Sequence, residues 1–274
     1  MDPLRSSGAW LYVPATRPDR FASAAASGAE RVVIDLEDTV PLGEKRAAAR
    51  ALRDATLPTA VPVYLRVNGP GTEWHGGDLA VAAGLAIAGI LLPRAEAAHG
   101  VLRAAGALPD HQQVIPVVET AAGVWNVLEV ARTRRVERLA LGALDLQLDA
   151  GMQEGGAGVV FARAQLVLAS RVAGLAPPLD TVTLAVDDEA AVVAAARQAR
   201  RDGFGGKLCV HPRQIPAVRR AFAPDTAELE WAEAVLRAAA ERGGGDHDPF
   251  LFRGALVDRP VLDRALRTVG QRQS

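Results

Sequence analysis

Two short apolar segments of the sequence each lead into one acidic residue. Val114–Thr120 reads VIPVVET and contains Glu119, and Leu139–Asp145 reads LALGALD and ends on Asp145. Two unpaired carboxylates that are brought together repel each other, and a shared cation removes that repulsion. Carboxylates without a nearby cysteine or histidine cluster suit Mg²⁺, or Mn²⁺, better than Zn²⁺. The sequence therefore predicts one magnesium ion bound by Glu119 and Asp145, with structural ion pairs to arginines as the alternative.

Polar residues also follow several other apolar segments. These residues are Asp35-Leu36-Glu37-Asp38, Arg66-Val67-Asn68-Gly69, Pro93-Arg94-Ala95-Glu96 and His211-Pro212. Arg66 offers a planar guanidinium that can bind an oxyanion through two parallel hydrogen bonds. Mg²⁺ keeps coordination positions for substrate oxygens, so a 2-oxo or 2-hydroxy acid can chelate it. These residue types indicate a site that makes or breaks a carbon–carbon bond beside a polarised carbonyl group.

Each of these polar residues has a structural alternative as well. Asp38 and Glu96 are acids that can stabilise the start of a following helix, by ~0.3–1 kcal/mol. Asn68-Gly69 is a common turn sequence. His211, which precedes Pro212, serves equally well as a hydrogen-bonded loop histidine. Where these side chains lie in the fold decides between the two readings.

The elements that must position these residues alternate along the chain. Apolar segments predict strands at Trp10–Pro14, Arg31–Leu36, Val61–Val67, Gly89–Pro93, Val114–Glu119, Leu139–Leu144, Thr181–Val186 and Lys207–Val210. Ala-rich stretches predict helices that include Arg17–Ser27, Glu44–Ala55, Gly123–Thr133, Val159–Ala173 and Glu189–Asp202. Continuous apolar strands are typical of a parallel sheet covered by helices. The pattern predicts an α/β fold, a (β/α)₈ TIM barrel whose C-terminal strand ends carry the site. A doubly wound open sheet is the alternative, weakened because no glycine fingerprint follows the first strand.

The sequence changes character after the eighth predicted strand. Glu228–Arg242 predicts a helix, Gly243–Pro249 (GGGDHDP) is a flexible linker sequence, and a final helix begins near Arg259. We therefore expect a barrel domain over residues 1–242, followed over residues 243–274 by a linker and a C-terminal lid helix. A segment this short does not fold by itself. It is expected to dock on the barrel, on a neighbouring subunit or over the site.

Composition excludes several classes of function. The 274 residues carry 31 basic and 32 acidic side chains, a net charge of −1, and the basic residues are scattered, so no nucleic-acid partner is expected. No segment approaches the ~20 apolar residues of a membrane span. The N-terminus lacks the pattern of a secretion signal, and the single Cys209 is expected to be a buried apolar residue. These features predict a soluble, cytoplasmic protein without a membrane partner.

A series of motifs extends almost from one end of the chain to the other. They are WLYVPATRPDRF, VVIDLEDTVPLGEKRAAAR, LRVNGPGTEW, ILLPRAEA, PVVETAAGVWN, LALGALDLQLDAG, GGKLCVHPRQI and FRGALVDRPVL. Each motif alone is weak evidence, but together and in this order they are specific. With them the chain resembles the citrate lyase beta-subunit-like family, the acyl-CoA lyases of the HpcH/HpaI aldolase superfamily. The resemblance implies a magnesium-dependent barrel that cleaves, or in reverse condenses, 3-hydroxyacyl thioesters.

The resemblance also implies catalytic roles for individual residues. The metal ligands of the family fall on Glu119 and Asp145, and Glu119 also contacts the substrate. The family's substrate arginine falls on Arg66, which is expected to stabilise the thioester enolate formed on cleavage. An aspartate of the C-terminal lid, often supplied by an adjacent subunit, acts as acid and base in the acyl-CoA lyases. That aspartate falls on Asp258.

Further residues are implied to contact the ligands. Backbone amides that receive the keto-acid carboxylate match Gly142, Ala143, Leu144 and Asp145, and regions that contact coenzyme A match Tyr12, Arg20, Val210 and His211. Leu144 departs from the family pattern, since many relatives have an acidic residue there. Arg94 likewise stands where a lysine is common. A leucine beside the ion favours an oxo acid with a methyl group, such as pyruvate.

These expectations combine into one function with two alternatives. The sequence predicts a lyase that cleaves citramalyl-CoA, malyl-CoA or a similar 3-hydroxyacyl-CoA to acetyl-CoA and a short 2-oxo acid. A citrate lyase beta subunit, which acts on a citryl thioester of an acyl carrier protein, is one alternative, and a non-catalytic barrel that binds other molecules is another. The resemblance further implies a homo-oligomer, a trimer or a hexamer.

Overall fold

The computed structural model describes residues 8–153, 155–242 and 248–271. The chain divides into two compact units, Met1–Phe222 and Ala223–Ser274. The first unit holds the predicted strands, and the second holds the helix and tail that follow them. The division falls before the helix near residue 230 and not after it, where the change in sequence character suggested a boundary at residue 242.

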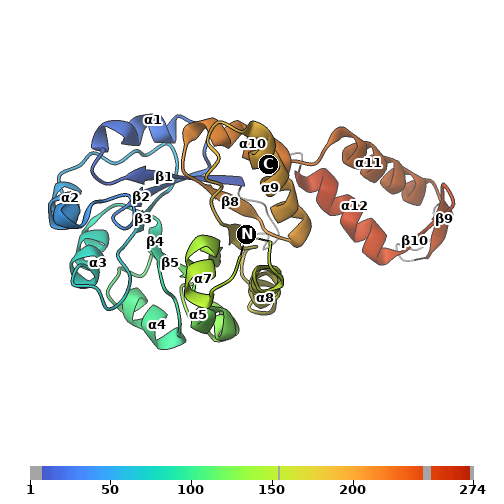
Figure 1. Cartoon of the computed structure of the whole chain (residues 1–274). Helices are drawn as coiled ribbons and strands as arrows, with labels where there is room; N and C mark the ends of the chain where they lie inside the picture. Colours follow the sequence, from blue (N-terminus) through green and yellow to red (C-terminus); the bar gives the residue numbers. More distant parts are fainter. Residues whose placement is uncertain (1–7, 154, 243–247, 272–274) are drawn as a thin grey trace. The chain divides into compact units, whose positions relative to one another are not determined.

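Eight parallel strands close into a barrel in the first unit, with helices around them (Figure 1). Each strand pairs with its neighbour in the sequence, and β1 also pairs with β8. The strands are β1 Gly8–Pro14, β2 Arg31–Asp35, β3 Val63–Arg66, β4 Gly89–Leu92, β5 Gln113–Val118, β6 Ala140–Leu141, β7 Leu179–Asp180 and β8 Gly206–Cys209. The predicted (β/α)₈ barrel is confirmed, and the open sheet is excluded.

The helices of the barrel unit follow the strands in order. They are α1 Phe21–Ala25, α2 Lys45–Ala51, α3 His75–Gly84, α4 Ala98–Gly106, α5 Ala121–Trp125, α6 Val127–Ala131, α7 Ala143–Ala150, α8 Ala157–Val172, α9 Glu189–Asp202 and α10 Ile215–Phe222. Short 3-10 turns η1 Pro18–Arg20, η2 Leu42–Glu44 and η3 Pro212–Gln214 precede α1, α2 and α10. The predicted helix Gly123–Thr133 is divided at Asn126, whose side-chain Nδ2 donates to the carbonyl of Glu96 at 2.9 Å.

Alternate strand residues face two different cores. One buried cluster contains strand residues only and fills the lumen: Trp10, Val33, Tyr64, Leu91, Ile115, Val117, Ala140, Leu179 and Leu208. Their neighbours along the strands, such as Leu11 and Ile34, pack with helix residues in the larger core outside the barrel. Because side chains alternate with a period of two, a residue two positions beyond a lumen residue also faces the lumen. This rule decides which strand-end residues meet at the barrel mouth.

Two predicted strands differ from the structure. The predicted strand Leu139–Leu144 is only Ala140–Leu141, because the chain turns at Gly142 and α7 begins at Ala143. The prediction of a strand over Thr181–Val186 is wrong, since β7 is Leu179–Asp180. Side chains from elsewhere bind the loop that follows β7: Lys207 Nζ donates to the carbonyl of Thr181 at 2.6 Å, and Gln214 Nε2 donates to that of Thr183 at 2.7 Å. Those carbonyls are bound without a strand partner.

The second unit has a small core of its own. Helices α11 Thr226–Glu241 and α12 Arg259–Gln271 flank the antiparallel strands β9 Phe250–Phe252 and β10 Ala255–Val257. Ala232, Val235, Phe250, Val257 and Ala265 form their buried cluster. This packing explains why α11 belongs with the tail and not with the barrel. Residues 243–247 of the predicted linker lie outside the described residues. Among the described helices, none is both long and apolar enough to cross a membrane.

Candidate active site

Because side chains alternate along the strands, four polar residues from the sequence analysis face the C-terminal mouth of the barrel. Tyr12, Asp35, Arg66 and Glu119 each lie two positions beyond a residue of the lumen cluster. Asp35 and Arg66 are register partners at the ends of β2 and β3. Glu119 directly follows β5. Polar side chains from four strands therefore converge where a parallel barrel carries its chemistry.

Arg66 is surrounded by carboxylates of its own chain. Its Nε and Nη2 donate to the two carboxylate oxygens of Asp35 at 2.6 and 2.7 Å. Its Nη1 donates to Asp38 Oδ2 at 2.8 Å and lies 3.2 Å from Glu37 Oε2. The guanidinium carbon lies 4.5 Å from the centre of the Tyr12 ring. We expected the guanidinium to bind a ligand oxyanion through two parallel hydrogen bonds. In the structure it makes this pair of bonds to Asp35, and Nη1 is directed at Asp38 and Glu37.

Glu119 is held from two sides. Its side chain is buried, and its Oε1 accepts a hydrogen bond of 2.8 Å from the backbone N–H of Arg94. Arg94 adopts a left-handed φ of 48°, which is uncommon for a residue with a side chain. On the other side lies Gly142, where a Cβ atom would come within 2.5 Å of Glu119 Oε2. A glycine at position 142 is therefore needed to give the Glu119 carboxylate its place.

Asp145 reaches the site from a helix and not from a strand end. It lies in the first turn of α7, with its side chain exposed. Burial of part of the group raises its pKa, as does the charge of Asp38, whereas Arg66 lowers it. Burial raises the pKa of Glu119 to about 7; the Arg94 N–H opposes this and the charge of Asp145 adds to it. The predicted ligand Asp145 therefore lies near enough to Glu119 for its charge to act on the Glu119 carboxyl group.

The donor set fits a hard divalent cation. The charge of Asp145 raises the pKa of Glu119, and a cation bound between two such carboxylates would relieve their repulsion. Among residues 8–153, 155–242 and 248–271, no group of three or more Asp, Glu, His or Cys side chains is arranged to hold a metal. Mg²⁺ does not need such a group, because water and substrate oxygens fill the rest of its octahedral shell. Glu119 and Asp145 are therefore suitable as the two protein ligands of such an ion.

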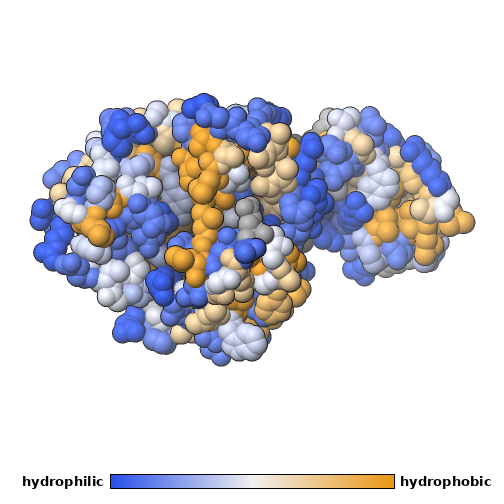
Figure 2. All heavy atoms as spheres, in the orientation of Figure 1, coloured by the Kyte–Doolittle hydropathy of each residue, from blue (hydrophilic) through white to orange (hydrophobic). Residues whose placement is uncertain are grey.

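The backbone amides at the start of α7 are partly occupied. The N–H of Gly142 donates to the carbonyl of Val118 at 3.0 Å, and that of Ala143 donates to Thr181 Oγ1 at 3.2 Å. Leu144 and Asp145 follow in the first turn, where an N–H has no carbonyl acceptor within its own helix. Of the four amides that the resemblance implied, these two are the better placed for a ligand carboxylate. The Leu144 side chain is 45% exposed, and hydrophobic residues show at the surface around α7 and α8 (Figure 2).

The structural roles considered in the sequence analysis hold for Asn68 and His211 but not for Asp38. Asn68 is buried and its Nδ2 donates to Asp78 Oδ2 at 2.6 Å, so it stabilises its turn. His211 accepts the Arg213 N–H at its Nδ1 and is a hydrogen-bonded loop histidine in this structure. The helix-start alternative for Asp38 is wrong, because the next turn begins at Leu42 and Asp38 binds Arg66. Asp38 thus belongs to the site.

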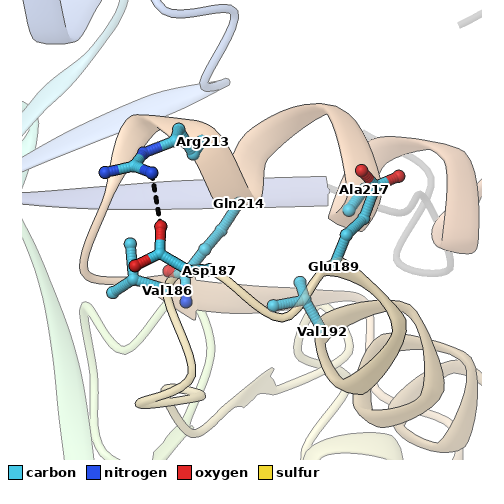
Figure 3. Close-up of a pocket in the computed structure, with 7 residues that line it drawn as sticks. All are labelled: Val186, Asp187, Glu189, Val192, Arg213, Gln214 and Ala217. Atoms are coloured by element: carbon cyan, nitrogen blue, oxygen red, sulfur yellow. Dashed lines mark hydrogen bonds and ion pairs between the residues drawn. The ribbon is translucent and has the colours of Figure 1, made fainter.

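Val210 and His211, predicted to contact coenzyme A, lie in the loop after β8. The buried Gln214 holds this loop, since its Oε1 accepts the Val210 N–H at 3.0 Å. Next to it is a pocket of about 230 Å³ lined by Val186, Asp187, Glu189, Val192, Arg213, Gln214 and Ala217. Figure 3 shows the Arg213 side chain directed at Asp187 across this pocket. The pocket is separate from the carboxylates of Glu119 and Asp145, which do not line it.

The remaining predicted residues have separate surroundings. Arg20 is exposed at the end of η1. Asp258 belongs to the second unit, where its Oδ1 accepts the Val261 N–H at 3.2 Å and its carbonyl accepts the Leu262 N–H at 3.0 Å. Asp258 therefore caps the start of α12. A test of Asp258 as an acid or base therefore needs a variant that keeps the helix cap.

Thr39 is a residue of the site that we did not single out in the sequence. Its hydroxyl donates to Asp35 Oδ2 at 2.7 Å, and its backbone N–H donates to the same oxygen at 3.0 Å. The only available signal was an acid followed four residues later by a hydroxyl residue, which is common in loops. Only the position of Asp35 beneath Arg66 makes the contact informative.

Glu37 provides a test of the electrostatics of this mouth. Burial raises its pKa to about 9, partly opposed by Arg66, and the charges of Asp38, Glu119 and Asp35 add to the increase. Between the unfolded pKa and about 9, the folded protein holds one proton more than the unfolded chain, so this group makes stability fall as pH rises. In metal-free buffer, Glu37→Gln removes this pH-dependent contribution. As pH rises from the unfolded pKa to about 9, the free energy of unfolding of Glu37→Gln minus that of wild type should increase by up to ~1.4 kcal/mol per pH unit. Denaturant unfolding at several pH values measures the difference, and a pH-independent difference would contradict it.

The comparisons with known proteins place the chain in a family. Residues 9–212 match the model of the HpcH/HpaI aldolase/citrate lyase family. A citrate lyase subunit beta-like protein from Mycobacterium tuberculosis is 39% identical, and the match covers 99% of each chain. A (3S)-malyl-CoA thioesterase from Cereibacter sphaeroides is 33% identical, over 96% of this chain and 94% of that protein.

A solved structure extends the likeness to the whole fold. Protein CitE from Mycobacterium tuberculosis, in complex with magnesium, acetoacetate and coenzyme A, superposes with a TM-score of 0.88. The two chains are 35% identical, and the match covers 98% of this chain and 99% of CitE. The family model alone spans most of the barrel unit. The chain belongs to the HpcH/HpaI aldolase/citrate lyase family and is an enzyme of the lyase class.

Proposed function

We propose that this protein is a magnesium-dependent lyase that cleaves a 3-hydroxyacyl-CoA, such as citramalyl-CoA or malyl-CoA, to acetyl-CoA and a short 2-oxo acid. The observation that carries the proposal is the meeting of Arg66 with the Glu119 and Asp145 carboxylates at one barrel mouth. Support comes from CitE, which was solved with magnesium, acetoacetate and coenzyme A. The relative that acts on malyl-CoA supports the same class of substrate.

Glu119 and Asp145 would hold Mg²⁺, or Mn²⁺, through their carboxylate oxygens. When bound, the ion supplies a positive charge beside the oxygen that becomes the keto group. The N–H groups of Leu144 and Asp145 would bind the carboxylate of the oxo-acid part, since a helix N-terminus favours an anion. Glu119 is oriented for this task by the Arg94 N–H. The oxo-acid end of the substrate is thereby fixed at α7.

The rest of the chemistry concerns the thioester end. The hydroxyl proton passes to a base, the carbon–carbon bond breaks, and its electron pair moves onto the thioester to give an enolate. Arg66 would stabilise the enolate oxygen through Nη1, the donor that now binds Asp38. Asp258 would protonate the enolate carbon and so form acetyl-CoA. In the condensing direction, the same carboxylate removes that proton.

Leu144 would influence which oxo acid is accepted. Its apolar side chain is partly exposed beside Asp145. A methyl group next to it is favourable, whereas the second carboxylate of oxaloacetate is not. Pyruvate, and therefore citramalyl-CoA, is the preferred member of the substrate class. One apolar contact of this kind changes selectivity by only ~10–200-fold.

A panel of CoA thioesters tests the proposed function. The full-length protein is incubated with citramalyl-CoA, malyl-CoA or citryl-CoA and Mg²⁺, and the products are identified by mass. Acetyl-CoA and an equal amount of oxo acid, lost on addition of EDTA, are the expected result. Free CoA with intact hydroxy acid would indicate a thioesterase instead. Turnover of a citryl carrier-protein thioester alone would indicate a citrate lyase subunit. No turnover, together with no binding of Mg²⁺ or thioester in calorimetry, would indicate a non-catalytic barrel.

A further inference from the structure

The Arg66 guanidinium is held by hydrogen bonds along one edge and lies over an aromatic ring. Along its edge, Nε and Nη2 bind both oxygens of Asp35 at 2.6 and 2.7 Å. Its guanidinium carbon also lies over the Tyr12 ring, 4.5 Å from the ring centre. An arginine side chain normally has many rotamers to lose on ordering. The Asp35 hydrogen bonds and the Tyr12 ring together restrict the orientations that this side chain can adopt.

Asp35 is itself held so that it cannot turn. It is fully buried. Besides Arg66, its oxygens accept the Glu37 N–H at 2.9 Å, the Thr39 N–H at 3.0 Å and the Thr39 hydroxyl at 2.7 Å. Burial alone would raise the pKa of Asp35, but the charge and hydrogen bonds of Arg66 and the Thr39 hydroxyl keep it below its usual value. Asp35 is therefore a charged, fully hydrogen-bonded anchor.

The anchor decides which atoms of Arg66 remain for a ligand. Nη1 is the nitrogen that Asp35 does not bind, and it is directed at Asp38 and Glu37. Asp38 is 65% exposed and can turn towards water, whereas Asp35 is fully buried. A ligand oxygen that arrives at the mouth therefore exchanges with Asp38 at Nη1, while the Asp35 edge stays in place.

We propose that Asp35, Thr39 and Tyr12 are positioning residues that aim Nη1 of Arg66 at the thioester oxygen of the substrate. The assignment rests on the proposed function. A donor that is already oriented needs no reorganisation when negative charge develops on that oxygen. Tyr12 thereby acquires a role through Arg66, in addition to the coenzyme A contact that the resemblance implies.

Thr39→Val tests the anchor with little change in shape, because valine replaces the hydroxyl by a methyl group. The loss of one hydrogen bond to a buried carboxylate is expected to lower kcat by about 10- to 100-fold. KM for the thioester should change by less than about threefold, because the Arg66 contact strengthens only as the enolate forms. Pyruvate binding in the presence of Mg²⁺, measured by calorimetry, should stay within about twofold. Thr39→Ser keeps the hydroxyl and should recover most of the rate.

Tyr12 is tested with a similar pair. Tyr12→Phe keeps the ring beside Arg66 and Tyr12→Leu removes it, so kcat of Tyr12→Leu should lie about 3- to 30-fold below that of Tyr12→Phe. Asp35→Asn should have the largest effect of the series. This variant removes the negative charge that binds the buried Arg66, so its kcat is interpreted only if thermal unfolding shows a folded protein. If Asp35→Asn does not fold, Thr39→Val and Thr39→Ser provide the test.

Two measurements separate this inference from the proposed function. If the wild-type protein cleaves no thioester, the proposed function fails. The positioning of Arg66 is then tested by ¹⁵N NMR, which follows the exchange of the Arg66 Nε–H proton with solvent. This exchange should be slow in the wild type and at least tenfold faster in Thr39→Val. If the wild type is active, Thr39→Val is combined with Arg66→Lys, which lacks the edge that Asp35 binds. The double variant should be no slower than Arg66→Lys alone. Equal kcat in wild type and Thr39→Val, or additive losses in the double variant, would overturn the assignment.

Discussion

Gly142→Ala is expected to abolish most activity and to weaken metal binding as strongly as Glu119→Ala does. The added Cβ would lie 2.5 Å from Glu119 Oε2 and 2.6 Å from Glu119 Cβ, well inside contact distance. The backbone cannot retreat, because the Gly142 N–H is bound to the Val118 carbonyl in the barrel. The Glu119 carboxylate must therefore move away from its present place, where Oε1 accepts the Arg94 N–H. We expect kcat to fall by at least ~10²–10³-fold, as for the loss of a group that stabilises developing charge.

Calorimetry with Mn²⁺ and Mg²⁺ measures this effect without turnover. Both Gly142→Ala and Glu119→Ala should bind the metal at least ~10-fold more weakly than the wild type. Gly100→Ala in α4 is the matched control, since a Cβ there meets nothing within 4 Å. It should leave metal binding and rate unchanged. Wild-type metal affinity in Gly142→Ala would contradict the placement of Glu119 as a ligand, and a fully active Glu119→Ala without metal would end the metal proposal.

The second large effect is expected for Asp258→Asn, with a loss of ~10²–10⁴-fold in turnover. Asparagine cannot donate or accept the proton that acetyl-CoA formation needs. It is nevertheless a good helix N-cap, so it keeps the acceptor that now binds the Val261 N–H. Folding, metal binding and thioester binding should therefore be retained. Asp258→Ala removes the cap as well and should lower stability by ~1 kcal/mol.

Comparison of these two variants separates catalysis from capping. Equal turnover losses with different thermal stability would assign the lost rate to the carboxylate. Turnover near that of wild type in Asp258→Asn would remove Asp258 from the mechanism. Mixing Asp258→Asn with Glu119→Ala protein then tests whether the second unit serves a neighbouring barrel. Mixed oligomers should regain up to about a quarter of wild-type activity if it does, and none if each chain completes its own site.

The sequence predicted the barrel because parallel strands have a simple signature. Continuous Val, Ile and Leu segments with helices between them identified most strands, and the position of Arg66 and Glu119 at C-terminal strand ends then placed both at one mouth. The strand predicted over Thr181–Val186 is absent, because the β-branched residues there lie in a loop. The carbonyls of that loop are bound by Lys207 and Gln214 from β8 and η3, which local propensity does not reveal.

The candidate site was predictable in its residue types but not in its contacts. Asp145 was expected at a strand end and lies in the first turn of α7, because the chain turns at Gly142. Both locations deliver a carboxylate to the mouth, so the error did not change the predicted chemistry. The edge of Arg66 that binds Asp35, and the Thr39 hydroxyl behind it, depend on register between β2 and β3 and on loop geometry. Such contacts cannot be read from spacing.

The filled lumen has a consequence for the order of events in a catalytic cycle. Trp10, Tyr64 and Leu91 belong to the side chains that occupy the barrel interior below the mouth. A ligand held at Glu119 and Asp145 must therefore enter and leave on the same side as a thioester held at Arg66. With both ligands sharing one opening, their release is expected to be sequential, and the ligand nearer to solvent departs first. Kinetic order would then follow from the packing of apolar side chains that touch neither ligand.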